Sequence, residues 1–522
     1  MLKDCITTDI YQPIDASKPL FFDLIDKIWQ HKDSQNHPLH RICSLFRKMK
    51  VGTVYVEELG FSNNDNIGKE LYYIQEKIKN NSLKAQLFRI SAFYEKSNKE
   101  PLEDNYLGYA AVLNIKNDKE PIKSYVIDSV VRIPMIFPDS SRLNDSIPSF
   151  EKPFPILNNY YHCTHQYTGY LNHKPLKING LLFCQQNEIT ACCAHACLRM
   201  AINNLPFIND NNLITTTDIL EISKDIKGTS SSVKITAEHL REIIEKLGYY
   251  SIFDDNVFDS INYESVAYPL MESGFPTIIE FTTRDQNTNH VITIVGHTLN
   301  SDLWHPEAEY GYSIPDWIGR SHIQSSSLTD HYIVMDDQFG PALCLSANSL
   351  GKKPTLKCKR VTGISRFPIK SKSYVIEELA SSYYKIGLYN INDNSAWIKR
   401  LKENIPIFRL FMLDKKSYIE HMENDVFENM EIPENLHDKI KNAPDHFWFI
   451  EFSLPDLYTA NKTKLGEIVI DDETNNIISL RYVGNLLFYD DKTSEWNYFD
   501  IKNISNHTPL LKSKLEIPCW EW

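Results

Sequence analysis

A cluster of cysteines marks the part of this chain best suited to chemistry. Five of the ten cysteines, from Cys163 to Cys197, fall within 35 residues, and Cys192 and Cys193 are adjacent. This pair directly precedes a segment with the apolar spacing of a helix, predicted to begin near residue 191. Its apolar face carries Leu198, Ile202 and Leu205. Unpaired amides and the positive end of the helix dipole stabilise a thiolate at such a position, which predicts a nucleophilic thiol there.

Three other side chains stand where such a thiolate would need them. His290 opens a buried-strand pattern about a hundred residues later, and it is the candidate base. Asp336 ends the next long strand pattern, where its carboxylate could accept a hydrogen bond from His290 and fix the tautomer. Upstream of the cysteines, the amide of Gln186 could stabilise the oxyanion of a tetrahedral intermediate. The order Cys, His, Asp predicts nucleophilic catalysis without a metal or a cofactor.

Four phrases in this order resemble papain-like cysteine peptidases, and most closely their bacteriocin-processing branch. The phrases are QQNEITACCAHACLRM, EKLGYY, GFPTIIEF followed by HVITIVGH, and DDQFGP, within roughly residues 180 to 345. That branch has a Gln, a Cys that opens a helix, Gly-x-Pro before a strand, and then strands that begin with His and end with Asp. The resemblance implies an α+β papain-like domain that hydrolyses a peptide or isopeptide bond in a polypeptide substrate.

By position, the resemblance assigns the nucleophile, the base, the orienting acid and the oxyanion amide to Cys193, His290, Asp336 and Gln186. Cys193 stands four residues before Cys197, as the helix phrase requires, whereas the usual six-residue spacing from Gln186 points to Cys192. Cys192 therefore stays the alternative nucleophile. Asp337 occupies the position of a proline in the family, which leaves the choice between the two aspartates open.

Other interpretations compete with a triad. Zinc would have ligands of suitable type, although no Cys-x-x-Cys pair is present, among His162, Cys163, His165, Cys184, Cys192, Cys193 and Cys197. The same triad could transfer an acyl group to an amine, as transglutaminase-like enzymes and acyltransferases do, or the domain could be a zinc-stabilised, non-catalytic binding module. His195, Cys197 and His297 are expected to have structural roles.

The surrounding elements predict an α+β protein with three domains. We expect an N-terminal α+β domain at 1–150, a papain-like domain at 156–368 and a strand-rich domain at 369–522, with a linker at Phe137 to Pro155. Residues 69–93 have the spacing of a helical hairpin, and two strands that start at Tyr106 and Ser124 are expected to form a β-hairpin.

Further helices and strands are expected between residues 236 and 336. A helix is expected from Thr236 to a left-handed cap at Gly248, and buried strands from Pro276, His290 and His331. Residues 301–330, with Trp304, Tyr310, Tyr312 and Trp317, are a candidate lid over the site.

Composition limits the partners. The 522 residues include 68 acidic and 55 basic side chains, a formal charge of -13, which disfavours nucleic acid as a partner and favours a neutral or basic polypeptide substrate. No apolar run reaches the length of a membrane helix and the first residues do not have the pattern of a signal peptide, so no membrane partner and a cytoplasmic location are expected. The sequence does not predict the oligomeric state.

Overall fold

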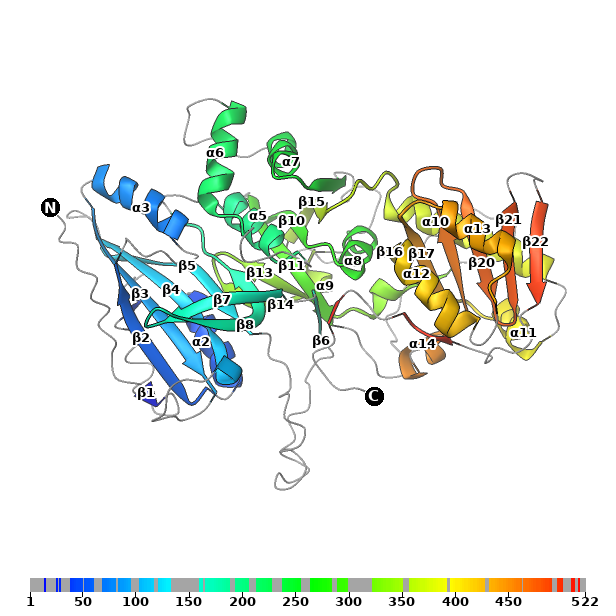
Figure 1. The fold of residues 1–522 in the computed structure, drawn as a ribbon, viewed down its shortest axis with the longest axis horizontal. Helices are drawn as coiled ribbons and strands as arrows, with labels where there is room; N and C mark the ends of the chain where they lie inside the picture. The colour runs from blue at the N-terminus through cyan, green and yellow to red at the C-terminus, as the bar shows by residue number, and fades with distance from the viewer. Residues whose placement is uncertain are drawn as a thin grey trace, which may run out of the picture.

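Three large, mostly antiparallel sheets, each covered by helices, follow one another in a computed structural model of the chain (Figure 1). The expected α+β class is thereby confirmed. The structure describes residues 14–15, 25–26, 28–29, 38–49, 51–60, 68–80, 83–94, 103–116, 121–132, 159–162, 165–187, 193–205, 213–227, 237–254, 263–283, 289–298, 322–350, 356–391, 395–427, 431–461, 463–490, 495–500, 508–511 and 515–516.

The first sheet has the strand order β1-β2-β3-β4-β5-β8-β7. Its strands are β1 (Ile14–Asp15), β2 (Thr53–Leu59), β3 (Lys84–Phe93), β4 (Tyr106–Lys116), β5 (Lys123–Val131), β7 (His165–Leu171) and β8 (Lys174–Phe183). Helix α2 (Pro38–Lys48) and helix α3 (Gly68–Asn80) belong to separate hydrophobic clusters formed with this sheet. The short 3-10 helix η1 (Glu103–Asn105) precedes β4.

The expected hairpin of strands is confirmed by the antiparallel pairing of β4 with β5. The expected helical hairpin is wrong in its second half, because helix α3 ends at Asn80 and residues 84–93 form strand β3. The apolar side chains there suit either conformation. Pairing with β2 on one side and β4 on the other gives β3 two ladders of hydrogen bonds, which outweigh local helical preference.

The central sheet has the order β14-β13-β11-β10-β15-β9, with β6 paired to β11 and β24 paired to β6. Its strands are β6 (Asn159–His162), β9 (Tyr250–Asp254), β10 (Thr277–Thr283), β11 (Asn289–Thr298), β13 (His331–Asp336), β14 (Gly340–Ser346), β15 (Leu356–Ser365) and β24 (Leu515–Glu516). The strands expected from Pro276, His290 and His331 are therefore confirmed as β10, β11 and β13.

Four longer helices pack on the central sheet. Helices α5 (Cys193–Asn203), α6 (Thr216–Lys227) and α7 (Ala237–Lys246) share one hydrophobic cluster with it, and α8 (Glu264–Glu272) belongs to another. The helices expected near residues 191 and 236 are thus confirmed, and Gly248 has the expected left-handed conformation, with φ of 85°. The short helix α9 (Ala347–Leu350) follows β14.

The third sheet has the order β12-β16-β17-β19-β20-β21-β22. Its strands are β12 (Ile323–Gln324), β16 (Ile407–Asp414), β17 (His446–Ser453), β19 (Gly466–Ile470), β20 (Ile477–Tyr482), β21 (Asn485–Asp490) and β22 (Glu495–Asp500). The helices and short elements of this part are η3 (Ser325–Leu328), α10 (Ser373–Asn390), α11 (Ala396–Glu403), α12 (Lys415–His421), the π-helical turn η4 (Met422–Val426), α13 (Glu434–Asn442) and α14 (Pro455–Asn461). Strands β18 (Thr463–Lys464) and β23 (Thr508–Pro509) form a separate pair.

Sheet membership crosses both expected domain boundaries. Strands β7 and β8, expected within 156–368, extend the first sheet through β5, and β12 joins the third sheet through β16. At the far end of the chain, β24 returns to the central sheet. The division at 150 and 368 therefore does not follow the strand pairing.

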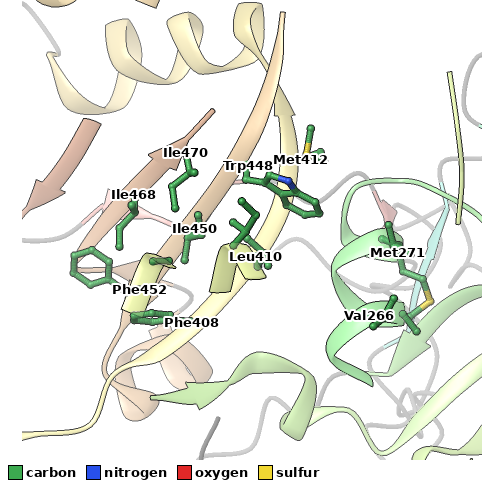
Figure 2. Packing of buried hydrophobic residues seen from close by; sticks show 14 of the residues in the cluster. Val266, Met271, Phe408, Leu410, Met412, Trp448, Ile450, Phe452, Ile468 and Ile470 are labelled. Carbon is green, nitrogen blue, oxygen red and sulfur yellow. The ribbon is translucent and has the colours of Figure 1, made fainter. Parts of the chain in front are cut away.

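The cores cross the same boundaries. One cluster joins α8 to the third sheet, where Val266 and Met271 face a layer that includes Leu410 and Trp448 (Figure 2). A second cluster joins α2 and the first sheet to α5, β11 and β13. The central sheet is thus fixed on both sides by apolar packing, and its strands are held at set positions.

Candidate active site

Cys193 is the first residue of helix α5, and its side chain is partly buried. Two hydrogen bonds fix the helix against β11: the Cys197 thiol donates to the carbonyl of Val291 (3.0 Å), and the Thr293 hydroxyl donates to the carbonyl of Cys197 (3.0 Å). Because these contacts lie one turn into the helix, they place its first residue at the start of β11. Cys192 lies outside the described residues.

His290 is the second residue of β11 and connects the thiol to the aspartates. Its Nε2 lies 3.1 Å from Oδ1 of Asp336, and its side chain is also hydrogen-bonded to Cys193. Since Nε2 is engaged by the carboxylate, Nδ1 is the nitrogen left for the thiol. Phe281, directly opposite on β10, packs edge-on against the imidazole with ring centroids 5.5 Å apart. The structure therefore brings Cys193, His290 and Asp336 into one chain of contacts.

The charges around His290 favour its protonated form. Burial acts against the imidazolium, but hydrogen bonds to Asp336 and Cys193, together with the negative charge of Asp336 and Asp337, raise the pKa of His290 to about 10. An imidazole with this pKa holds a proton at neutral pH.

The two aspartates occupy different environments. Oδ1 of Asp336 accepts the backbone N–H of Gln338 (2.9 Å) as well as facing His290, so this carboxylate is fixed on both sides. Asp337 is fully buried, its Oδ1 is 3.7 Å from Nε2 of His290, and neither of its oxygens has a hydrogen-bond partner in the described part of the chain. Burial raises the pKa of Asp337 to about 7, with His290 acting against this rise. Geometry thus gives the orienting position to Asp336.

The two glutamines upstream of Cys193, Gln185 and Gln186, have different contacts. The Gln185 amide oxygen accepts the N–H of Val126 (2.9 Å), and its backbone N–H donates to the Val126 carbonyl (2.8 Å), which ties the end of β8 to β5. Gln186 is partly buried next to it. Among the contacts of the described residues, none joins Gln186 to Cys193 or His290, so its place in an oxyanion hole stays a prediction.

The two other histidines considered from the sequence, His195 and His297, are buried. His195 is buried within α5, and burial lowers its pKa to about 4. His297 is fully buried, with Nε2 2.8 Å from Glu272 and its ring packed 4.9 Å from Tyr268. Both positions agree with the structural roles expected from the sequence.

The zinc set expected as an alternative is only partly described. Cys163 and Cys192 lie outside the described residues, as do the side chains of His162 and His165. Cys184 contacts the carbonyl of Ala196 at 3.7 Å. Within the described part of the chain, the group of side chains close enough to hold an ion is a different one, His290 with Asp336 and Asp337.

Most of the candidate lid also lies outside the described residues, including its four aromatic side chains, as does the expected linker before Pro155. The described end of the candidate lid, from residue 322 on, forms β12, which pairs with β16 of the third sheet, and the 3-10 helix η3 that follows it.

Sequence reasoning missed two neighbours of the triad. Phe281 could have been found from register, because a hairpin pairing of β10 with β11 places it opposite His290. Arg41, which holds the strand after the aspartates, has no sequence signal, since it is 295 residues from Asp336.

Comparison with known proteins gives no relative: no family model, no curated protein and no solved structure matches the chain. None of the helices in the described residues is long and apolar enough to cross a membrane.

Proposed function

We propose that this protein is a cysteine peptidase that hydrolyses a peptide or isopeptide bond with Cys193 as nucleophile, His290 as base and Asp336 as the orienting acid. The observation that carries the proposal is the continuous contact from the helix-opening thiol through His290 to the Asp336 carboxylate. The papain-like character of the central sheet and its helices rests on the resemblance described above.

The reaction follows from the positions of these groups. His290 already holds the thiol proton before attack, and the Cys193 sulfur attacks the substrate carbonyl carbon to give a tetrahedral oxyanion. The backbone N–H of Cys193 and the amide of Gln186 would donate to this oxyanion. Collapse of the intermediate breaks the C–N bond, and the imidazolium gives its proton to the leaving amine. Water, deprotonated by His290, then attacks the thioester and releases the acid and the thiol.

Charge favours a particular kind of substrate. The whole chain carries a formal charge of -13, and two aspartates stand at the site. A neutral or basic polypeptide segment would approach such a surface more readily than an acidic one. An amine in place of water would turn the same acyl-enzyme into an amide-transfer enzyme.

The test is the rate of iodoacetamide labelling of each cysteine at pH 6.5, read by mass spectrometry, in the wild type and in His290→Gln. Cys193 is expected to label faster than Cys344, which is the exposed thiol of the six described, because a neighbouring imidazolium stabilises the thiolate. His290→Gln is expected to slow Cys193 by about 100-fold, the lower range of a base's contribution. The labelling of Cys344 is the internal control and stays unchanged.

Two results would contradict the proposal. Slow labelling of Cys193 in the wild type, equal to that in His290→Gln, would remove the activated pair. Labelling that becomes fast only after a chelator is added would instead favour a metal held by His290, Asp336 and Asp337.

A further inference from the structure

We propose that Arg41, on helix α2 of the N-terminal part, is a positioning residue of the active site: it clamps the strand that follows Asp336 and so holds the acid against His290. The inference rests on the proposed function. It assigns to the N-terminal part a role in catalysis, since α2 packs in the core that joins the first sheet to the central sheet.

The clamp consists of two hydrogen bonds to successive carbonyls of β14. Arg41 Nε donates to the carbonyl of Pro341 at 3.1 Å, and Nη2 donates to the carbonyl of Ala342. A guanidinium presents these two donors in a fixed planar fork, so both carbonyls are held in one geometry. Cys344 and Tyr161 are titratable groups that interact electrostatically with Arg41.

The backbone of β14 is shaped for this contact. Ala342 has φ of 52°, a left-handed conformation that costs free energy in a residue with a Cβ. Gly340 has φ of 118°, and a Cβ there would lie 2.7 Å from Cβ of Arg41. Ala342, in a strained conformation, and Gly340, where a Cβ would be too close to Arg41, therefore both lie at the clamp. Both allow α2 to approach β14 closely.

The clamp acts on the acid through a short turn. Gly340 pairs directly with Asp336 in the β13–β14 ladder, and Phe339 N donates to the Asp336 carbonyl at 3.2 Å. Asp336 Oδ1 meanwhile accepts from Gln338 within the same turn. Arg41 thus holds one end of a four-residue connection whose other end is the residue that orients His290. Movement of that connection by even about 1 Å would lengthen the contact from Asp336 to His290, and displacements of this size can cost up to about 100-fold in rate.

Arg41→Gln is the test, with the full pH dependence of Cys193 labelling as readout. We expect labelling at pH 6.5 to fall about tenfold, because the imidazolium loses a well-placed carboxylate. At pH 9 or above, where a thiol ionises without help, the rate is expected to equal that of the wild type. Arg41→Lys retains one donor and the charge, and it is expected to recover part of the loss.

Internal controls separate positioning from a general loss of structure. Cys43 on α2 and Cys184 at the end of β8 are buried in the core that α2 shares with the central sheet, so they stay unlabelled while α2 remains docked. Arg47→Gln, an exposed arginine of the same helix, is the matched variant and is expected to leave the profile unchanged. Gly340→Ala should reproduce the Arg41→Gln profile, and the two changes together should cost no more than one of them.

The outcomes distinguish this inference from the proposed function. A fast wild-type Cys193 with a superimposable Arg41→Gln profile would overturn the positioning role and leave the peptidase proposal intact. Equal losses at pH 6.5 and pH 9, accompanied by labelling of Cys43, would also overturn it, because they indicate that Arg41 only stabilises the fold. A slow wild-type Cys193 would overturn both.

Discussion

Two groups of buried charged residues in this protein differ in how completely their charges are paired. Between the end of α8 and the third sheet, three acids and three cations alternate from Glu272 to Arg481, and neighbouring charges lie within 3.0 Å. At the candidate active site, two aspartates face one histidine, and Asp337 has no hydrogen-bond partner for either oxygen in the described part of the chain. The first group is balanced in charge, whereas the second has two aspartates for one histidine and keeps a net negative charge when both acids are ionised, even with His290 protonated.

The balanced group, which we call the ion network, runs across the third sheet. Its members, in order of contact, are Glu272, Arg409, Glu451, Lys464, Glu467 and Arg481. Despite burial, which favours a neutral acid, Arg481 and Lys464 hold the pKa of Glu467 well below its usual range. The network also ties down the end of the chain, because Arg409 donates to the Leu511 carbonyl (2.9 Å) and Arg481 donates to the Thr508 hydroxyl (2.8 Å).

This difference in pairing shows that buried charges can serve either structure or chemistry. A buried charge that is fully paired fixes a structure and has little chemistry left. A buried carboxylate without a hydrogen bond, next to a histidine and a thiol, raises the free energy of the resting state unless a proton is held nearby. Uncompensated charge therefore separates the candidate active site from the ion network, although a histidine contacts acids in both places: His290 at the site and His421 beside Glu467.

Breaking the ion network is expected to give the largest change in stability. Arg409→Met removes the cation between Glu272 and Glu451, which lie 2.7 Å away on either side, and leaves both acids buried. We expect the free energy of unfolding to fall by about 3 to 5 kcal/mol, as when one partner of a buried pair is removed. Urea denaturation measures this. Arg400→Met, an exposed arginine on α11, is the control and is expected to change little. A loss below about 1 kcal/mol for Arg409→Met would show that the network is not tightly coupled.

Neutralising Asp337, the aspartate without a hydrogen bond, is expected to change stability in the opposite direction. The pKa of Asp337 is raised to about 7 from its ordinary 3.8, so the folded protein holds this proton more tightly than the unfolded chain. The stability that the proton contributes is full below about pH 3.8 and is lost as the pH rises through about 7. Asp337→Asn should therefore stabilise the protein by about 1 to 2 kcal/mol at pH 8 and by much less at pH 5.

Asp336→Asn is the matched control for this prediction, since it changes the neighbouring residue that does have partners. It is expected to reduce stability at both pH values and to slow Cys193 labelling at pH 6.5 more than Asp337→Asn does. Equal effects of the two substitutions would contradict the division of roles between the aspartates. Denaturation curves at pH 5 and pH 8 give the comparison.

Sequence patterns could predict the local elements but not the arrangement of the sheets. The strand-rich C-terminal region was predictable because β16, β17, β19 and β20 are dense in aromatic and β-branched residues. The return of β7 and β8 to the first sheet was not, because pairing between distant strands leaves no mark on either one. The same reason explains why residues 84–93 resembled a helix.

The catalytic candidates could be predicted from the sequence, but the contacts that hold them in place could not. The helix-opening position of Cys193 and the strand-opening position of His290 follow from spacing, and the structure places both as expected. Part of the ion network is visible in the sequence as charged residues inside apolar strands. These residues are Arg409, Glu451, Glu467 and Arg481. A lone charge in a buried strand demands a partner, although sequence does not say which.

The smallest expected effect concerns His421, which contacts Glu467 of the ion network, and its two acidic neighbours. His421 lies 2.7 Å from Asp425 and 2.9 Å from Glu467, but the Asp425 side chain is 37% exposed and that of Glu467 is 1% exposed. Because solvent screens the outer pair, Asp425→Asn is expected to cost less than about 1 kcal/mol, whereas Glu467→Gln should cost several times more. Hydrogen bonding to His421 lowers the pKa of Asp425, so its small contribution is present above pH 3.8 and disappears as the pH falls below that value. Urea denaturation of both variants at pH 7 measures the two losses, and equal losses would contradict the expectation that the buried acid, which also pairs with Lys464 and Arg481, contributes more than the screened one.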